Sequence, residues 1–462
     1  MNIATSVSQQ PPPFYLFLSG RAGVGKSHTV HTIYQTAIRM LKKPGNSVDS
    51  PSIILTAPTG KAAVHIGGTT LHNAFRLPVK KRGGYEHKHQ SAASLNSMRS
   101  VYCQLKILVI DEISMVGATT LSNLNLTMQD IFENEQPFGN IAVLALGDLK
   151  QLNLVGEKPV YKECKSGYAA LASSVWELFK LFELTEIVRQ KEDPMFAQLL
   201  SRVRVGQQTK QDVDQVKALE QNTNIPNNSL SIFLTNKLKD KYNIAQLEQL
   251  PAKVYTFTAK DSQRDLNTKC VAINVTSSNM HETGGLVSEV KVAEMAKYMQ
   301  TKNVDIPDGL VNGATGTIIK IDIPENKPLD GTIYVKFDDP KIGRKAMASS
   351  AHKNLVPIKA VSAAFSITEK STSIQVERTQ FPGTLVWRIT VHKSQGSTFE
   401  QMVDDMTTPD GKTNTMPGEI YTMLSRAKSM EVLKLCAFHA NKIKVNESTL
   451  HEMERLDECN TL

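Results

Sequence analysis

Apolar residues occur along this chain in short, unbroken runs, each followed by turn or polar residues. Such runs span Phe14–Leu18, Ile53–Leu55 and Ile107–Ile110, and a fourth lies in IAVLALG, which leads into Gly147 and Asp148. Unbroken runs of this length are typical of strands that are buried on both faces of a parallel sheet. They predict an α/β fold for the first part of the chain.

Segments with helical spacing lie between or after these runs. The first has a single apolar stripe, which consists of Val30, Ile33, Tyr34, Ala37, Ile38 and Leu41. A second amphipathic helix is predicted after Asp193 and Pro194, with a stripe from Phe196 to Val203. SIFLTN at 231–236 and VLKLC at 432–436 predict further buried strands, so we expect a second α/β domain.

The pattern changes between about residues 311 and 386. TIIKIDI and TIYVKF alternate apolar and polar residues and flank the turn-rich stretch PENKPLDG, which predicts a small antiparallel β module. The predicted boundaries are 1–180 for the first domain, with a small insertion at about 76–100, then 181–310 and 387–462 for the second domain, and 311–386 for the β module inserted into it.

Composition adds less information. The chain has 462 residues, with 53 Lys and Arg against 45 Asp and Glu, so its net charge is +8. This excess favours a polyanionic partner, although a solvated basic surface has the same charge. No apolar run is long enough to span a bilayer, and the first residues lack a secretory signal. The five cysteines have no C-x-x-C spacing, which favours a reducing compartment without disulfides or a zinc site.

The first apolar run leads directly into a phosphate-binding pattern, Gly20-x-x-x-x-Gly25-Lys26-Ser27. In this pattern the glycines let backbone N–H groups surround the phosphates, the lysine neutralises charge and the serine hydroxyl binds magnesium. A glycine-rich turn without function is the alternative, but the strand, loop and helix have the order that the motif needs. The predicted nucleotide-binding residues are Gly20, Ala22, Gly23, Val24, Gly25, Lys26, Ser27 and His28.

Polar residues also follow the other predicted strands, at the edge where an open α/β sheet binds ligands. Asp111 can reach the magnesium ion that Ser27 holds, and Glu112 can orient or deprotonate a water. Gln151 can sense a γ-phosphate, although it is equally consistent with a turn. Acidic residues at the start of a surface helix are the alternative for the carboxylate pair.

Eight segments resemble, in order, the motifs of the Pif-type (Pif/RecD-like) DNA helicases of superfamily one. They are GRAGVGKS, APTGKAA, TTLHNAF, IDEISM, GDLKQL, LTEIVRQ, HKSQGST and YTMLSRAKS, and they extend from about residue 14 to 430. Any one of them is weak evidence, whereas eight in the same order are specific. The chain also resembles helicases of Helitron-like mobile elements.

The resemblance implies two RecA-like P-loop motor domains with a small SH3-like β insertion in the second. It implies ATP and Mg²⁺ as cofactors, Ser27 and Asp111 as metal ligands, and Arg189 and Arg426 as arginine fingers. On the residues alone, a surface salt bridge is the simpler interpretation of either arginine. The implied catalytic residues are Lys26, Glu112, Gln151, Arg189 and Arg426.

The resemblance also implies a DNA-binding surface, for which a polar loop without function is the alternative on composition alone. Its predicted residues are Thr59, Lys61, His72, His392, Lys393 and Ser394. The basic stretch 76–90 is either a strand-separating insertion or a solvated loop.

Three features depart from the family pattern. Family members usually carry a glutamine-containing segment that recognises adenine well before the P-loop strand, whereas here thirteen residues precede Phe14 and Gln9 or Gln10 is the candidate for this role. Asn153 and Leu154 replace two prolines after GDLKQL, and MVDDM is more acidic than the usual apolar strand.

The function expected is an ATP-dependent helicase and translocase on single-stranded DNA, and the family implies 5′→3′ movement. Tailed or structured duplex DNA is the expected second partner, and we expect an intracellular monomer, nuclear in a eukaryote and otherwise cytoplasmic. A P-loop phosphotransferase that acts on a small substrate is one alternative. A nucleotide-regulated DNA-binding protein without unwinding activity is the other.

Overall fold

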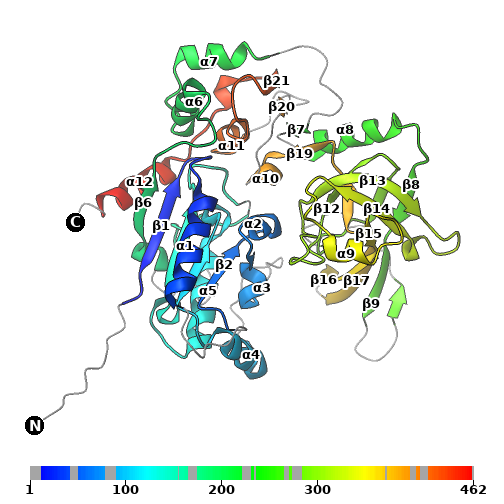
Figure 1. Cartoon of the computed structure of the whole chain (residues 1–462), viewed down its shortest axis with the longest axis horizontal. Coiled ribbons are helices and arrows are strands. Elements are labelled where there is room, and N and C mark those ends of the chain that lie inside the picture. Colours follow the sequence, from blue (N-terminus) through cyan, green and yellow to red (C-terminus); the bar gives the residue numbers. More distant parts are fainter. Residues whose placement is uncertain are drawn as a thin grey trace, which may run out of the picture.

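The computed structural model describes residues 12–41, 50–78, 90–154, 156–164, 174–220, 230–233, 236–264, 270–272, 283–369, 372–395, 402–405 and 415–459. These residues form two α/β lobes, each with a parallel sheet, and an antiparallel β part beside them (Figure 1). No helix in these ranges is long and apolar enough to cross a membrane.

The first lobe has a six-stranded parallel sheet in the order β3-β2-β4-β5-β1-β6. Its strands are β1 (Tyr15–Gly20), β2 (Ile53–Ala57), β3 (Thr69–Thr70), β4 (Ile107–Ile110), β5 (Ala142–Gly147) and β6 (Lys180–Leu184). Its helices are α1 (Lys26–Leu41), α2 (Gly60–His65), α3 (Leu71–Phe75), α4 (Ala92–Tyr102) and α5 (Ala118–Phe132). The predicted buried strands are therefore confirmed, and their carboxyl ends meet at one edge.

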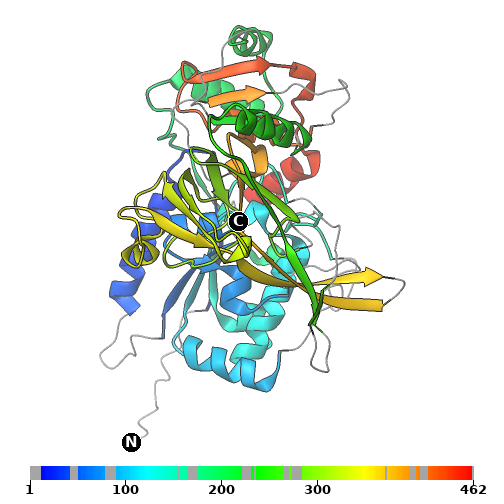
Figure 2. The same ribbon diagram turned by 90° about the vertical axis from the view of Figure 1, so that its right-hand side faces the viewer.

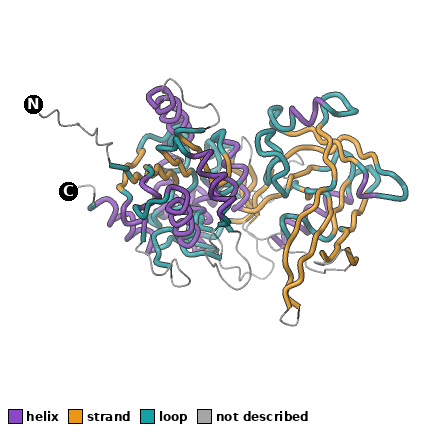
Figure 3. Tube along the Cα trace, turned by 90° about the horizontal axis from the view of Figure 1, so that it is seen from below, coloured by secondary structure: helices purple, strands orange, loops and turns teal. Residues whose placement is uncertain are grey.

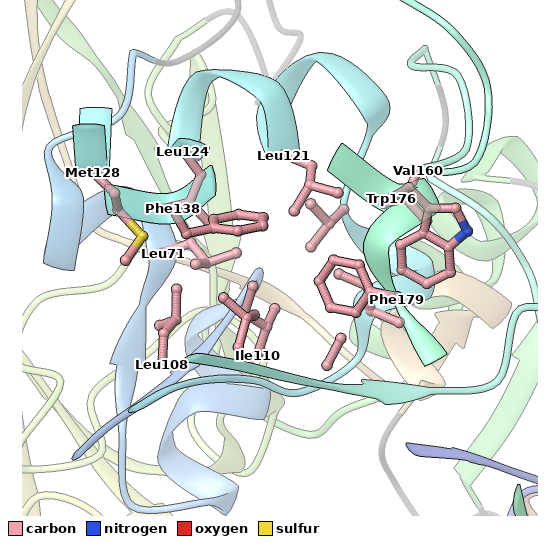
Figure 4. Packing of buried hydrophobic residues seen from close by; sticks show 14 of the residues in the cluster. Leu71, Leu108, Ile110, Leu121, Leu124, Met128, Phe138, Val160, Trp176 and Phe179 are labelled. Atoms are coloured by element: carbon pink, nitrogen blue, oxygen red, sulfur yellow. The ribbon is translucent and has the colours of Figure 1, made fainter. Parts of the chain in front are cut away.

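The larger of the two cores of this lobe lies between the sheet and helix α5 (Figure 4), and a second core includes residues of the sheet, α1 and α2. Leu121, Leu124 and Met128 are spaced three and four residues apart, so α5 directs them together toward Leu108 and Ile110 of β4. Each such side chain contributes about 1.5–3 kcal/mol when it is fully buried. The core thereby fixes the strand ends from which the polar residues project.

The second lobe has a four-stranded parallel sheet in the order β19-β7-β20-β21. Its strands are β7 (Leu230–Phe233), β19 (Arg388–Thr390), β20 (Met402–Asp405) and β21 (Leu433–Ala437). Its helices are α6 (Pro194–Arg204), α7 (Lys210–Lys217), α8 (Asn236–Glu248), α10 (Val391–Ser394) and α11 (Glu419–Leu424). The predicted amphipathic helix is α6, which begins where the Asp193 side chain accepts a hydrogen bond from the Phe196 amide.

The antiparallel part begins earlier in the chain than predicted. The strands expected around the turn at 324–331 are confirmed as β13 (Thr315–Asp322) and β14 (Thr332–Phe337), in the sheet β15-β14-β13-β12-β18. Its other strands are β12 (Lys297–Gln300), β15 (Val356–Lys359) and β18 (Gly383–Leu385). The antiparallel part also contains a second sheet and a separate strand pair. Their strands are β8 (Tyr255–Thr258), β9 (Lys260–Arg264), β10 (Cys270–Ala272), β11 (Glu289–Val292), β16 (Val361–Glu369) and β17 (Thr372–Gln380). The second sheet has the order β10-β9-β17-β16, and β11 pairs with β8.

The predicted start of this part at residue 311 is therefore wrong, because antiparallel pairing begins at β8. Strands such as β9, KDSQR, are short and polar, so they give no alternating apolar signal. Strands β16 and β17 form a long hairpin that projects from the body of the molecule (Figures 2 and 3). The short helix α9 (Arg344–Ala348) packs beside β15.

Two other boundaries also differ from the prediction. Strand β6 continues the first sheet to Leu184, beyond the predicted boundary at 180. Helix α12 (Glu447–Glu458), which was expected in the second domain, packs on the first lobe, where Met453 and Leu456 join its core. Within the predicted insertion at 76–100, α4 adds Met98 to the same core, while residues 79–89 lie outside the described ranges.

Candidate functional site

The loop between β1 and α1 has the backbone that the glycine pattern predicts. Gly23 and Gly25 have φ angles of +86° and +81°, in the left-handed region that favours glycine. A side chain at Gly23 would also place its Cβ 2.3 Å from the Cβ of Arg189. The loop therefore needs glycine at 23 both for its backbone angle and for close contact with the segment 188–190.

Lys26 begins α1 and turns back toward its own loop. Its Nζ donates to the carbonyl oxygens of Gly20 at 2.7 Å and Arg21 at 3.1 Å. Burial lowers the pKa of Lys26, while the nearby carboxylates of Asp148 and Glu112 oppose that shift. The ammonium thus lies among the carboxylates at the carboxyl edge of the sheet.

Asp111 and Glu112 follow β4 at this edge. Asp111 is 4% exposed, and burial together with the charge of Glu112 raises the pKa of Asp111 to about 7. Glu112 has a left-handed backbone with φ +52°, and its buried Oε2 has no hydrogen-bond partner among the described residues. A desolvated carboxylate pair with an unpartnered oxygen fits a cation and its bound water.

Arg189 contacts the glycine loop through its backbone and the second lobe through its side chain. The amides of Val188 and Arg189 both donate to the Gly23 carbonyl at 2.9 Å. The Arg189 guanidinium donates to the Ser425 carbonyl at 2.9 Å, and burial and Arg426 lower the pKa of Arg189 to about 10. Residues 23, 189 and 425 therefore join the loop of the first lobe to the segment that follows α11.

Arg426 reaches the first lobe at Gln151. Its Nη2 lies 3.5 Å from Gln151 Oε1, and its Nε donates to the Thr422 carbonyl at 2.9 Å. Only 2% of Arg426 is exposed, so burial lowers its pKa, with the charge of Glu112 opposing. A surface salt bridge is thus excluded for Arg426, whose buried guanidinium lies beside Gln151 of the first lobe.

The loop that carries Gln151 is embedded in the second lobe. The Leu152 amide donates to Thr422 Oγ1 at 2.9 Å, and the Leu152 carbonyl accepts from Gln395 Nε2 at 2.9 Å. The Leu152 side chain is fully buried in the core of the second lobe. Segment 148–152 therefore links the sheet edge to residue 395, within the stretch HKSQGST.

Asp148 anchors the same loop through a pair that the sequence did not reveal. Arg204, at the end of α6, donates to Asp148 Oδ1 from Nη2 at 2.8 Å and from Nε at 3.2 Å. Both side chains are almost completely buried. The available sequence signal was the position of Arg204 beside the apolar stripe of α6, where a charge needs a buried partner.

Two of the predicted DNA-binding lysines lie where the lobes approach the antiparallel part. Lys61 Cδ is 3.3 Å from the position that a Cβ at Gly313 would occupy, and Lys393 Nζ is 4.0 Å from Met299 Sδ. Burial lowers the pKa of each lysine to about 8. The charge of Lys61 further lowers the pKa of Lys393, so the two ammonium groups lie near enough to repel each other.

The remaining predicted residues belong either to the DNA-binding set (Thr59, His72 and His392) or to the nucleotide-binding set (Val24, Ser27 and His28). Thr59 caps α2 by accepting from the Ala62 amide at 3.3 Å, and His392 is half-buried on α10. His72 lies on α3, where burial lowers its pKa and Glu157 opposes the shift. Half-buried Ser27, exposed His28 and buried Val24 have the positions expected on and before the first turn of α1.

Two predicted contacts are not made in this structure. Ser394 is fully buried and its hydroxyl donates to the Val391 carbonyl at 2.7 Å, so it does not face a DNA surface. The Ala22 amide donates to the Tyr421 hydroxyl at 3.1 Å, so it does not point into a phosphate cradle. Both errors have one cause, because the sequence does not reveal which polar groups bond within the protein.

Comparison with known proteins agrees with this geometry. Residues 1–214 match the family model for PIF1-like helicases. The predicted resemblance is confirmed. Across 96% of its length, this chain is 27% identical to the ATP-dependent DNA helicase RRM3 of Saccharomyces cerevisiae, of which it covers 65%. It therefore spans less than two thirds of that relative.

Solved structures of Pif1 show the same fold. Bacteroides Pif1 bound to single-stranded DNA has a TM-score of 0.71 and 24% identity, with 97% of this chain and 95% of that chain covered. Its complex with ADP-AlF3 and single-stranded DNA has a TM-score of 0.70 and 24% identity, with 96% and 94% covered. The predicted fold class of two RecA-like α/β domains is confirmed, and the SH3-like description of the β insertion stays a prediction.

Proposed function

We propose that this chain is an ATP-dependent DNA helicase that moves 5′→3′ along single-stranded DNA and unwinds the duplex ahead of it. The observation that carries this proposal is the meeting of Arg426 from the second lobe with Gln151 from the first. A motor needs contacts of this kind, because ATP hydrolysis must change the position of one lobe relative to the other. A phosphotransferase acting on a small substrate has no need of a second parallel α/β lobe at its P-loop.

Each residue of the site has a proposed role in hydrolysis. Ser27 and Asp111 would hold the magnesium ion, which would neutralise charge on the phosphates of ATP. Glu112 orients and deprotonates the attacking water, for which its unpartnered Oε2 is suited. Lys26 and Gln151 contact the terminal phosphate.

Arg189 and Arg426 act on the same phosphate from the second lobe. Their guanidinium groups stabilise charge in the transition state, and such a contribution amounts to about 10³–10⁵ in rate. Both side chains are held by backbone carbonyls of residues 422 and 425, so the second lobe sets their orientation.

Single-stranded DNA is the proposed substrate, and tailed or structured duplex DNA the proposed target of unwinding. Thr59, Lys61, His72, His392 and Lys393 would bind its phosphates with little sequence preference. The +8 net charge supports a polyanionic partner. The similarity to Bacteroides Pif1 bound to single-stranded DNA, and to a Pif1 structure that describes unwinding at forked double-stranded DNA by two coordinating helicases, supports the same substrates. We propose that the chain acts as a monomer inside the cell, in the nucleus of a eukaryote.

The test is ATP hydrolysis and unwinding by the purified chain. We expect single-stranded DNA to stimulate hydrolysis many-fold, and a duplex with a 5′ tail to be unwound while one with a 3′ tail is not. Lys26→Ala should abolish both activities. Glu112→Gln should bind ATP and DNA but not unwind, whereas full biological activity of this variant would favour the DNA-binding alternative. A rate of ATP hydrolysis that does not change when single-stranded DNA is added would favour the phosphotransferase alternative.

A further inference from the structure

Tyr421 connects the two lobes at the first residues of the P-loop. It lies on α11 of the second lobe, with 4% of its surface exposed. Its hydroxyl is 3.1 Å from the Ala22 amide and 3.1 Å from Asp148 Oδ2. Both partners belong to the first lobe, one just after β1 and the other just after its neighbour β5.

The direction of these two hydrogen bonds is fixed by chemistry. The Ala22 N–H can only donate, so the phenol oxygen accepts from it and the phenol proton goes to Asp148. Burial raises the pKa of Asp148, but Arg204, Lys26 and the Lys150 amide together more than offset this, so the pKa lies below its usual value and the group is a carboxylate. Burial and the charge of Asp148 raise the pKa of Tyr421, which therefore keeps its proton.

The loop is also held at two neighbouring residues, by α6 of the second lobe and by the segment 188–189, which connects β6 to α6. Arg21 donates to Ser201 Oγ on α6, and the Gly23 carbonyl accepts the amides of Val188 and Arg189. The Ala22 side chain packs in the core of the second lobe. Residues 21–23 are thus fixed by the second lobe and this connecting segment, while residues 24–28 remain on the first lobe at the start of α1.

We propose that Tyr421 is a positioning residue, whose hydroxyl ties Ala22 to Asp148 and sets the phosphate loop in its hydrolytic geometry when the lobes are closed. In an open state the phenol leaves the loop, and the backbone at 22 loses its acceptor. The contact therefore makes the shape of the P-loop depend on lobe closure. This inference rests on the proposed ATP hydrolysis, because it assigns a role within that reaction.

The test is Tyr421→Phe, which removes one oxygen and keeps the ring in the core. We expect kcat for DNA-stimulated ATP hydrolysis to fall about tenfold, the effect of one lost hydrogen bond to a charged network. The dissociation constant for a fluorescent ATP analogue without DNA should change less than about twofold, because the open state lacks the contact. Rates are normalised to the amount of nucleotide-binding protein.

Tyr298→Phe is the matched control. Tyr298 is equally buried, and its hydroxyl donates to Gln300 Oε1 at 2.7 Å within the antiparallel part. Its loss should lower thermal stability and leave kcat unchanged. A purely structural Tyr421 would behave in the same way as this control.

The outcomes separate the two proposals. A wild-type kcat for Tyr421→Phe overturns the positioning role, and so does a variant that no longer binds nucleotide, since that result marks a structural residue. Failure of the wild-type chain to hydrolyse ATP would instead overturn the proposed function itself.

Discussion

Arg204 binds Asp148 across the boundary between the two lobes, with its Nη2 2.8 Å from Oδ1. Side-chain exposure is 4% for the arginine and 0% for the aspartate, so water does not screen the pair. Removing one member of such a pair leaves an uncompensated buried charge. The pair is therefore the main polar anchor between α6 and the loop after β5.

Arg204→Met should destabilise the protein by about 3–5 kcal/mol, because Asp148 would remain buried without its cation. Chemical denaturation measures this loss as a lower free energy of unfolding. Lys327→Met is the control, since Lys327 and Asp330 form an exposed pair whose loss should have little effect. Equal stability of the two variants would show that the buried pair does not anchor the lobes.

The same pair predicts how stability depends on acid. The pKa of Asp148 is lowered in the folded protein, so its contribution is fully present above the pKa of an unfolded aspartate. That contribution is lost as pH falls through the lower folded pKa. We expect Asp148→Asn to flatten the decline of unfolding free energy below about pH 4. If the unfolding free energy of Asp148→Asn declined as steeply as that of the wild type in this pH range, the ionised Asp148 would not be the stabilising group.

Lys393 predicts an alkaline loss of DNA binding. Burial lowers its pKa to about 8, so the ammonium is charged at pH 7 and neutral at pH 9. Because phosphates bind the charged form, affinity for single-stranded DNA should fall up to about tenfold over this range for each such lysine. Fluorescence anisotropy at constant ionic strength measures the affinity.

Lys393→Met should bind DNA more weakly at pH 7 and depend less on pH than the wild type. Lys180→Met is the matched control, because Lys180 is exposed on β6 at the edge of the first sheet. It should keep both the affinity and the pH dependence. If Lys393→Met retained the complete pH profile, the titrating group would lie elsewhere.

Helix α12 predicts a stability link between the end of the described chain and the first lobe. Leu456 is fully buried in the core of that lobe, so Leu456→Ala should cost about 2–5 kcal/mol in unfolding free energy. Met40→Ala is the control, since Met40 is 79% exposed on α1. A small effect at Leu456 would mean that α12 is only loosely attached.

The residues that local pattern could predict are those at strand ends. Lys26, Asp111 and Glu112 follow directly from apolar runs, and a parallel sheet brings its carboxyl ends to one edge. The same reasoning correctly expected Gln151 there. Whether a residue directly follows a strand depends only on its neighbours along the chain, so the local sequence pattern predicts it.

Contacts between distant segments could not be predicted in this way. Tyr421 is 273 residues from Asp148, and Gln395 is 243 residues from the carbonyl of Leu152. Amphipathic spacing predicts that α12 buries one face, but it does not say which sheet receives that face. The early strands of the antiparallel part were missed because they are only three to five residues long, which is too short for a clear periodic pattern.

The proposed mechanism requires that the two lobes close on one nucleotide, with Arg426 supplied by the second lobe. Arg426→Lys keeps the charge but loses the planar group that reaches Gln151. The control is Arg202→Lys, at a partly exposed arginine in the last turn of α6 that pairs with Asp212 of α7. The decisive measurement is the rate of ATP hydrolysis in saturating single-stranded DNA. We expect this rate to fall about 10³-fold or more for Arg426→Lys, while its nucleotide affinity stays nearly unchanged and the control variant hydrolyses ATP normally. A wild-type rate for Arg426→Lys would contradict it.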